Sequence, residues 1–476
     1  MKIYILTEEK PKASVIKQLM DIYNDDFGVG YTIKEPIKIK PIFADNKFTF
    51  DYVVEGIKIN GIEDIIIKTV SGESSFLDFL FYVQDHSPIE GSKTEEPLFA
   101  VEETKTSGAE SRNTNAYQRG TKFIYFRHFF PKVPAYMLYN DELGEGENKT
   151  PTDTEVFGTR TLMTLGVKYI GKKMFSNYVA FKSLDELINA KNSMDPPPAG
   201  NTPVRITKEP TRITISGTLS KPVEKGNIGH DPNIGCLSMI SAAIRSLGWK
   251  HDIVITQSKV KQSYINGTAV INKFLYVCEL LKLKIDGVTL KTYSLPDKYW
   301  HYEKSSEKMA SILFHVSCEY IGLLEVYQNH AGCERGYFKP ASGELITIPK
   351  YCGENASGVT IPLENKNTPC SNKRNLLIPD VIMRDESKKI IYLIEGKKLS
   401  TINEGLAEIK LYDDIESLYV KKYFPGYTIK RYLTIFGGSH TTLIDNKILL
   451  YLSDDGTVII NSSETSLKND LEKTAF

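Results

Sequence analysis

Hydrophobic and polar positions along this chain follow two periods, that of a strand and that of a helix, and both are clearest over residues 376–438. Two apolar runs, LLIPDVIM and IIYLIEG, flank the charged segment RDESKK, which predicts two strands joined by a turn. Apolar residues then recur at helical spacing between Ile402 and Tyr419, and Pro425 ends the predicted helix. A further strand is predicted over TIKRYLTIFGG. The expected order is therefore strand, strand, helix, strand.

The N-terminal part of the chain also mixes the two periods. Strands are predicted over residues 1–6, 50–59 and 62–70, and a helix over residues 13–23. The runs SSFLDFLFYV and PLFAVEETK predict two more strands, although the segment HSPIEGSKTEEP between them is longer than a hairpin turn. Together these patterns predict a mixed α/β (α+β) fold.

Two later helices are predicted from their ends and their apolar stripes. Residues 231–248 begin with Asp231, which can cap a helix, and Pro232, which suits the first helical position. The run SSEKMASILFHVSCEYIGLLEVYQ predicts one long helix over residues 305–328 that carries Glu319.

The length of the chain predicts more than one domain. A chain of 476 residues exceeds the usual size of a single hydrophobic core. We expect an N-terminal α/β module over residues 1–190 and a C-terminal module over residues 266–476. Residues 191–265 are expected to form a connecting region that supplies DNA recognition, and the proline-rich segment NSMDPPPAGNTPVR at its start reads as a linker.

Charge and cysteine content narrow the class of protein only slightly. The 59 basic and 59 acidic residues cancel, so the chain carries no overall basic signature for nucleic acid. Six cysteines are scattered without a CxxC pair, and there is no N-terminal apolar signal region, which predicts reduced thiols and a cytoplasmic location. No run of eighteen apolar residues predicts a membrane-spanning helix.

Charged residues at the ends of the two C-terminal strands are the first candidate site. Glu395 and Lys397 are two residues apart in a predicted strand, so their side chains point to the same face. The predicted hairpin brings Asp380 to the neighbouring strand. Buried carboxylates are costly unless a cation or a partner compensates them. The pattern favours a Mg²⁺ site for phosphodiester hydrolysis, and the alternative is a half-exposed hairpin with a surface ion pair.

These residues carry a family resemblance. Pro379-Asp380, fourteen intervening residues and then Glu395-Gly396-Lys397 resemble the PD-(D/E)xK signature of the restriction-endonuclease-like nucleases. The resemblance implies a central mixed sheet flanked by helices, with Mg²⁺ held by Asp380, Glu395 and the Gly396 carbonyl, and a catalytic Lys397. It also implies an accessory acid on the preceding helix, for which Glu319 is the candidate. Enzymes of this kind often keep their basic groups in a cleft, so a neutral net charge is compatible with DNA binding.

A second, looser match lies near residue 100. Asp78 and the pair Glu103 and Lys105 form another D…ExK pattern, without the preceding proline. Here Asp78 and Glu103 would hold Mg²⁺ with Lys105 as the lysine, which predicts two restriction-endonuclease-like modules in one chain. The segment that follows offers donors for substrate phosphates, namely Arg112, Gln118, Arg119 and Lys122. The alternative is a solvated loop and helix beside a core strand.

The resemblance implies a bacterial type II restriction endonuclease, a hydrolase that cuts double-stranded DNA in restriction-modification. Two sites would let a monomer cut both strands. Alternatively, one site is degenerate and serves recognition, or a homodimer pairs identical sites. Two other functional hypotheses remain open: a repair, recombination or RNA-processing nuclease of the same fold, and a non-catalytic DNA-binding protein.

Overall fold

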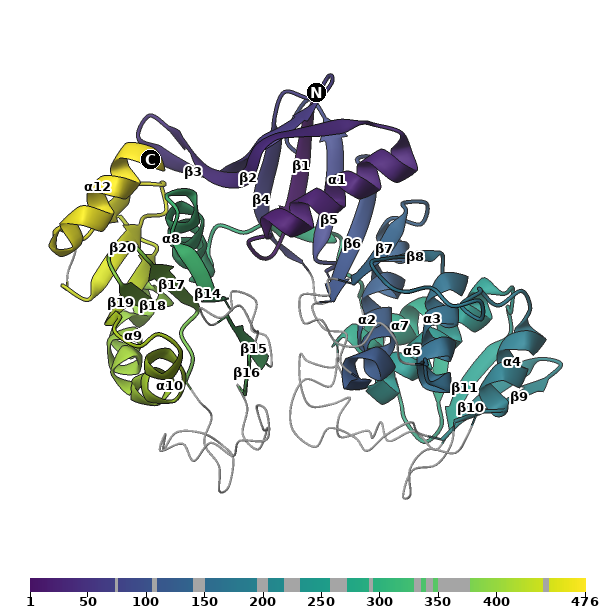
Figure 1. The fold of residues 1–476 in the computed structure, drawn as a ribbon. Coiled ribbons are helices and arrows are strands. Elements are labelled where there is room, and N and C mark those ends of the chain that lie inside the picture. Colours follow the sequence, from purple (N-terminus) through teal and green to yellow (C-terminus); the bar gives the residue numbers. More distant parts are fainter. Residues whose placement is uncertain are drawn as a thin grey trace. The chain divides into compact units, whose positions relative to one another are not determined.

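The computed structural model in Figure 1 describes most of the chain. The residues that it does not describe are 73–75, 105–108, 140–149, 195–203, 218–231, 257–271, 291–293, 329–334, 340–345, 350–376 and 440–444. Among the described residues, no helix is both long enough and apolar enough to cross a membrane.

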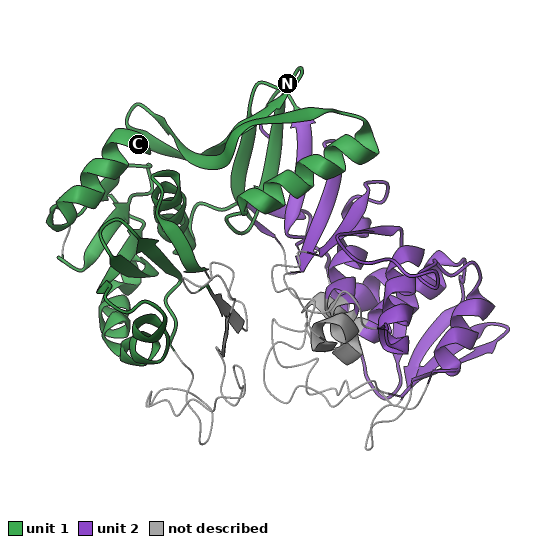
Figure 2. Cartoon of the chain, in the orientation of Figure 1, with its two compact units in different colours: residues 1–70, 84–86, 302–476 green, residues 71–83, 87–301 purple. Residues whose placement is uncertain are grey.

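The described chain forms two compact units, coloured in Figure 2. Unit 1 contains residues 1–70, 84–86 and 302–476, and unit 2 contains residues 71–83 and 87–301. Both ends of the chain therefore belong to unit 1. These units are defined by packing alone. They therefore do not test the three functional regions expected from the sequence, which remain a prediction.

A six-stranded mixed sheet forms the C-terminal part of unit 1, in the order β14-β17-β18-β19-β20-β21. Its strands are β14 (Leu324–Gln328), β17 (Val381–Asp385), β18 (Ile390–Lys398), β19 (Thr428–Phe436), β20 (Ile448–Leu452) and β21 (Val458–Ile460). Strands β17 and β18 form an antiparallel hairpin, whereas β18 pairs in parallel with β19, and β19 with β20. The predicted order of strand, strand, helix, strand is confirmed.

Helices cover this sheet, and the alternation of β18 assigns side chains to its two faces. Helix α8 (Lys308–Tyr320) packs on β17 to β20, and Gly396 of β18 faces it. Ile391 and Leu393, which point the other way, share a buried cluster with Tyr412 from the helical connection between β18 and β19. That connection contains α9 (Ile402–Glu408), α10 (Asp413–Ile415) and α11 (Lys421–Tyr423), with short 3-10 and π segments, and α12 (Thr465–Thr474) ends the chain.

The first seventy residues give unit 1 a further group of strands, in the order β2-β3-β4-β1. The elements are β1 (Lys2–Thr7), α1 (Ala13–Phe27), β2 (Tyr31–Ala44), β3 (Lys47–Ile59) and β4 (Ile65–Gly72). The start of β3 meets the turn before β21, where Phe48 N–H donates to the Gly456 carbonyl at 2.8 Å. Two small strands, β15 (Arg335–Phe338) and β16 (Ile346–Pro349), pair with each other.

Unit 2 begins with strands in the order β5-β6-β7-β8. The elements are β5 (Phe79–Gln84), β6 (Phe99–Thr104), α2 (Ala109–Phe129), β7 (Ala135–Tyr139), α3 (Asp153–Thr164) and β8 (Val167–Ile170). Strands β5 and β6 are antiparallel, and β6, β7 and β8 are parallel, with α2 and α3 as the connecting helices. The order β5-β6-α2-β7 thus repeats the strand, strand, helix, strand order of unit 1.

The rest of unit 2 is a small sheet with helices. Its sheet has the order β12-β11-β10-β9. The elements are α4 (Leu184–Asn192), β9 (Arg205–Glu209), β10 (Arg212–Ser216), α5 (Pro232–Ser246), β11 (Asp252–Thr256), α7 (Asn272–Leu281) and β12 (Leu283–Ile285), and β13 (Trp300–Tyr302) leads the chain back to unit 1. Helix α5 packs against α2 at Gly120, where a β-carbon would lie 2.2 Å from Cγ of Met239.

The mixed α/β class predicted from the sequence is confirmed, with several mixed sheets flanked by helices. The prediction of one helix over residues 305–328 was wrong. Helix α8 ends at Tyr320, Gly322 has a left-handed backbone with φ of 97°, and β14 starts at Leu324. Apolar residues continue past the helix because Val326 and Tyr327 of the strand are also buried, and hydrophobic content alone does not separate the two elements.

Candidate active site

The hairpin β17–β18 brings the predicted C-terminal residues together. Val381 pairs with Ile394, so Asp380, one residue earlier, lies beside the residues that follow Ile394. The Asp380 carboxylate accepts a hydrogen bond through Oδ2 from Gly396 N–H at 3.0 Å. The sequence prediction that a hairpin places Asp380 next to the Glu-Gly-Lys segment is confirmed.

Glu395 is held by a lysine of its own strand and by a tyrosine of the helical connection. Lys397 Nζ donates to Glu395 Oε1 at 2.7 Å, as expected for side chains on one strand face. Tyr412, which is fully buried, donates its hydroxyl to Glu395 Oε2 at 2.5 Å. Lys397 also forms an ion pair of 2.8 Å with Glu408 of α9. Both oxygens of Glu395 are thus fixed in position.

Ionisation is disfavoured at both carboxylates of this site. Burial and the nearby charge of Glu395 raise the pKa of Asp380 well above its ordinary value. Burial and the charge of Glu408 raise the pKa of Glu395, although Lys397 and Tyr412 lower it. Two neighbouring carboxylates whose ionisation is disfavoured form an arrangement that a bound cation relieves.

Lys397 is the cation that the site already contains. Burial lowers its pKa, but the charges and hydrogen bonds of Glu395 and Glu408 outweigh burial and hold it above the ordinary lysine value. Lys397 is therefore an ammonium at neutral pH. In this state it can donate hydrogen bonds and stabilise negative charge, and it cannot take a proton from water.

Two glycines let the flanking helices come close to these residues. A β-carbon on Gly396 would lie 3.1 Å from both Asp380 Oδ2 and Ser311 Oγ of α8. A β-carbon on Gly405 of α9 would lie 2.7 Å from Cγ of Lys397. The strand end that carries the charged groups is therefore enclosed by a helix on each face.

The acid that the structure brings near this site is Glu307, directly before α8, and not the expected Glu319. The charge of Glu307, the residue directly before α8, contributes to the raised pKa of Asp380. Glu319 lies near the opposite end of the helix, about 18 Å further along its axis at 1.5 Å per residue. The sequence placed an acid on the correct helix, but it could not show which end of the helix meets Asp380.

A second charged group has the same hairpin geometry in unit 2. Phe79 of β5 pairs with Val101 of β6, and Asp78 directly precedes Phe79. Asp78 accepts a hydrogen bond through Oδ2 from Glu103 N–H at 2.7 Å. The corresponding donor to Asp380 is Gly396, so Glu103 takes the position of the glycine. The acid in the position of Glu395 is therefore Glu102.

Glu102 meets its cations from a helix instead of from its own strand. Lys122 of α2 donates to Glu102 Oε1 at 2.8 Å and Oε2 at 2.7 Å, and to Asp78 Oδ1 at 3.2 Å. Arg119, one turn earlier, places Nε 3.0 Å from Glu102 Oε1. Thr104 takes the strand position that Lys397 occupies in the first site.

The environment of Glu102 is strongly perturbed. The residue is 1% exposed. Burial and the charge of Asp78 raise its pKa to about 7, although Lys122 and Arg119 lower it. A carboxylate with such a pKa, next to a second acid and a lysine, is typical of a functional site as well as of a buried ion-pair network.

Only some of the other residues predicted near this second site reach it in the structure. Glu103 supplies its backbone N–H to Asp78, and its side chain lies on the strand face opposite to Glu102. Arg119 and Lys122 both reach the Glu102 carboxylate. Three predicted site groups fall outside the described part of the structure: residue Lys105 and the side chains of Arg112 and Gln118. In the sequence FAVEET both strand faces carry a glutamate, so alternation alone could not choose Glu102.

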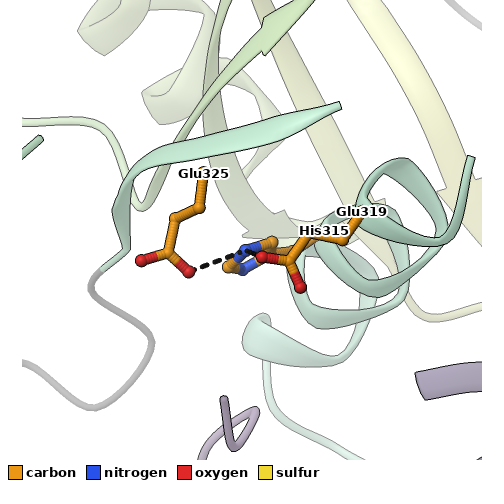
Figure 3. Close-up of side chains that lie close together, drawn as sticks. All are labelled: His315, Glu319 and Glu325. Atoms are coloured by element: carbon orange, nitrogen blue, oxygen red, sulfur yellow. Dashed lines mark ion pairs between the residues drawn. The ribbon is translucent and has the colours of Figure 1, made fainter. Parts of the chain in front are cut away.

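A third cluster, which the sequence did not predict, lies at the end of α8 (Figure 3). His315, Glu319 and Glu325 place ligand-type atoms within 4.8 Å of one another, and no other such group of three occurs among the described residues. His315 Nε2 lies 3.1 Å from Glu325 Oε2 and 3.6 Å from Glu319 Oε1. The three side chains come from a helix and the strand that follows it.

A lysine already provides the positive charge of this cluster. Lys10 Nζ forms an ion pair with Glu319, lies 3.4 Å from His315 Nε2 and 3.8 Å from Glu325 Oε2. Lys12 adds an ion pair of 3.7 Å with Glu325. These contacts form an ion-pair network between the segment after β1 and the end of α8.

Comparison with known proteins assigns neither a family nor a function to this chain. No family model matches the chain, and neither the curated proteins nor the solved structures gave a significant match.

Proposed function

We propose that this protein is a Mg²⁺-dependent endonuclease that hydrolyses double-stranded DNA at a centre formed by Asp380, Glu395 and Lys397. The observation that carries the proposal is the hairpin geometry, which places the partly buried Asp380 and the buried Glu395 on paired strand ends beside the Lys397 ammonium. The PD-(D/E)xK resemblance of the same residues supports a type II restriction endonuclease with a restriction-endonuclease-like fold. The scattered cysteines support action in the cytoplasm, and the number of active centres decides between a monomer and a homodimer.

The residues present fit a magnesium ion. Asp380, Glu395 and the Gly396 carbonyl offer hard oxygen ligands, and Mg²⁺ is commonly bound through one or two carboxylates together with substrate phosphates. Each carboxylate oxygen can accept more than one partner, so the bonds from Lys397 and Tyr412 leave capacity on Glu395. When bound, the ion would activate water and offset the negative charge that develops on the phosphate.

The chain's own groups then have distinct roles. Lys397, as an ammonium, donates a hydrogen bond to the attacking water or to a phosphate oxygen and stabilises the developing charge. Tyr412 and Lys397 together fix the orientation of the Glu395 carboxylate. The Gly396 N–H fixes Asp380, so both acids are positioned by the backbone and by buried donors before substrate binds.

The proposal is tested with unmethylated plasmid DNA, the full-length protein and Mg²⁺. Discrete fragments are expected from the native chain. The Lys397→Ala and Glu395→Gln variants should lower the cleavage rate by about 10² to 10⁴, the range for losing a positioned charge or general acid–base group. Lys398→Ala removes the next lysine of the same strand, which is exposed, and is the matched control.

The outcomes separate the hypotheses. Double-strand cleavage into discrete fragments that is lost in Lys397→Ala and kept in Lys398→Ala supports the proposed centre. Cleavage into a smear, or of RNA or branched DNA alone, would replace the restriction enzyme by another nuclease. Absence of Mg²⁺-dependent cleavage by the native chain, with DNA binding unchanged in both variants, would make the protein a non-catalytic DNA binder.

A further inference from the structure

The hairpins β5–β6 and β17–β18 place an aspartate and a glutamate in the same register. In each, the aspartate directly precedes the first strand and accepts the N–H of the residue after the glutamate, at 2.7 Å in one and 3.0 Å in the other. The residue after each aspartate pairs with the residue before each glutamate. Asp78 and Glu102 therefore correspond to Asp380 and Glu395 in backbone geometry, whereas the sequence pattern had matched Glu103 to Glu395.

The two hairpins differ in the element that supplies the lysine. In the first hairpin, Lys397 reaches Glu395 along the strand. In the second, Thr104 stands at that strand position, and Lys122 reaches Glu102 from α2, the helix that directly follows β6. The contact from the helix includes both oxygens of Glu102 and one of Asp78, so a single ammonium touches both acids.

We infer that Asp78, Glu102 and Lys122 form a second phosphodiester-hydrolysing centre, in which the lysine is supplied by α2. The assignment replaces Glu103 and Lys105 of the sequence pattern by Glu102 and Lys122. It rests on the proposed nuclease function for its reaction. Each centre then cuts one strand, and one chain makes the double-strand break.

Helix packing explains how a lysine from α2 can take this role. Gly120 of α2 carries no side chain where Met239 of α5 presses against the helix. Lys122 is two residues further and points about 200° around the helix axis from Gly120, at 100° per residue. The packing of α5 on one side of α2 therefore holds Lys122 on the other side, toward Glu102.

The donor set of the second centre fits Mg²⁺ for the same reason as the first. Two carboxylates with hard oxygen atoms lie together, one of them buried, next to an ammonium that can stabilise a phosphate. Hydrolysis consumes one water for each bond. The water oxygen bonds to phosphorus, the P–O3′ bond breaks, one hydrogen ends on the 3′ hydroxyl, and the second leaves the new 5′-phosphate for solvent.

The first experiment follows supercoiled plasmid with the full-length protein and Mg²⁺. The native chain should give linear DNA. Lys122→Met and Glu102→Gln, which keep approximate side-chain size and remove charge, should accumulate nicked circles, with linear product formed at least tenfold more slowly. Lys105→Ala should behave like the native chain. Glu186→Gln, which breaks the ion pair with Arg160 between α3 and α4, is the control for loss of an ion pair in the same unit.

The second experiment measures metal binding without cleavage, by titrating Mn²⁺ into protein without DNA and recording free Mn²⁺ by electron paramagnetic resonance. Asp380→Asn should keep a binding event that the double variant Asp380→Asn, Glu102→Gln loses. This measurement decides the inference even if the native chain cuts no DNA, a result that would sink the nuclease function alone.

Two results would overturn the second centre. One is Mn²⁺ binding in the double variant equal to that in Asp380→Asn alone. The other is linear product formed by Lys122→Met at the native rate, which is the result expected if two copies of the Asp380 centre cut the two strands. In either case Lys122 and Glu102 are a buried ion pair that fastens α2 to β6.

Discussion

At the scale of single residues, function depends on how each buried charge is compensated. The Glu395 carboxylate has a donor on each oxygen, and the Lys397 ammonium has a carboxylate on each side. Breaking one member of such a set leaves the others buried without a partner, which costs more than the net strength of the bond that was lost.

Tyr412→Phe tests the positioning of Glu395. The change removes the 2.5 Å hydrogen bond and keeps the buried ring. A hydrogen bond to a charged group contributes about 1.5–3 kcal/mol, so kcat should fall roughly tenfold or more while KM for DNA stays constant. Tyr427→Phe removes a hydroxyl bonded to Lys389 elsewhere in the unit and serves as the control. An unchanged kcat would show that Tyr412 has no positioning role.

The Lys10 cluster predicts a stability change in acid. Burial opposes ionisation of Glu319, but Lys10 and His315 outweigh burial and lower its pKa from 4.5 to about 2. A lowered folded-state pKa stabilises the protein above pH 4.5, and this contribution is lost as pH falls from 4.5 to about 2. Glu319→Gln should be less stable than the native chain at neutral pH, and the difference should shrink over that range. Chemical unfolding at several pH values measures it, and a constant difference would contradict the prediction.

At the scale of elements, the site is a strand end enclosed by helices. Helix α9 can approach β18 only because Gly405 has no side chain at its closest point to Lys397 and Leu433. The same strand meets α8 through Gly396. The charged residues are therefore held by packing between three elements, and none of these elements positions them alone.

Gly405→Ala separates the activity of the site from its stability. Alanine favours a helix over glycine by about 1 kcal/mol, but its β-carbon would lie 2.7 Å from Lys397 Cγ. We expect unfolding stability within about 1 kcal/mol of native and a cleavage rate lowered at least tenfold, because Lys397 must move. Gly30→Ala, at a glycine with no heavy atom within 4 Å of the added carbon, is the control. Native cleavage by Gly405→Ala would show that Lys397 tolerates the displacement.

At the scale of the whole chain, unit 1 joins segments from both ends of the sequence. Strand β3 begins against the turn between β20 and β21, where Phe48 N–H donates to the Gly456 carbonyl and Lys47 pairs with Asp455. The Lys10 cluster connects the segment after β1 to α8 in the same unit. The N-terminal residues therefore support the part of the chain that carries the Asp380 centre.

Gly456→Ala should weaken this connection. Gly456 has φ of 86°, and a β-carbon there would lie 2.2 Å from the Phe48 carbonyl oxygen. Gly426→Ala has the same kind of backbone strain at φ of 83°, with nothing within 4 Å, so it isolates the effect of the contact. We expect each change to cost about 1–3 kcal/mol through the backbone, and Gly456→Ala to cost more than Gly426→Ala. Equal thermal unfolding of the two variants would contradict a stabilising role for the contact.

The sequence by itself determined the mixed α/β class, the strand, strand, helix, strand order after residue 376, and the proximity of Asp380, Glu395 and Lys397. These features depend on local periodicity and on a short hairpin, which neighbouring residues specify. It failed where a buried strand continues a buried helix, as at Gly322, because both elements are apolar.

Only the tertiary structure showed that Lys122 reaches Asp78 and that Glu102 takes the strand position of Glu395. The register of β5 against β6 places Glu102, and not Glu103, in the position of Glu395. The packing of α2 brings Lys122, which follows Glu102 by twenty residues in the chain, to the Glu102 carboxylate. It also decided that Glu307, and not Glu319, lies near Asp380. These choices depend on the pairing and direction of elements distant in the chain, and a shift of one residue turns every side chain of a strand to its other face.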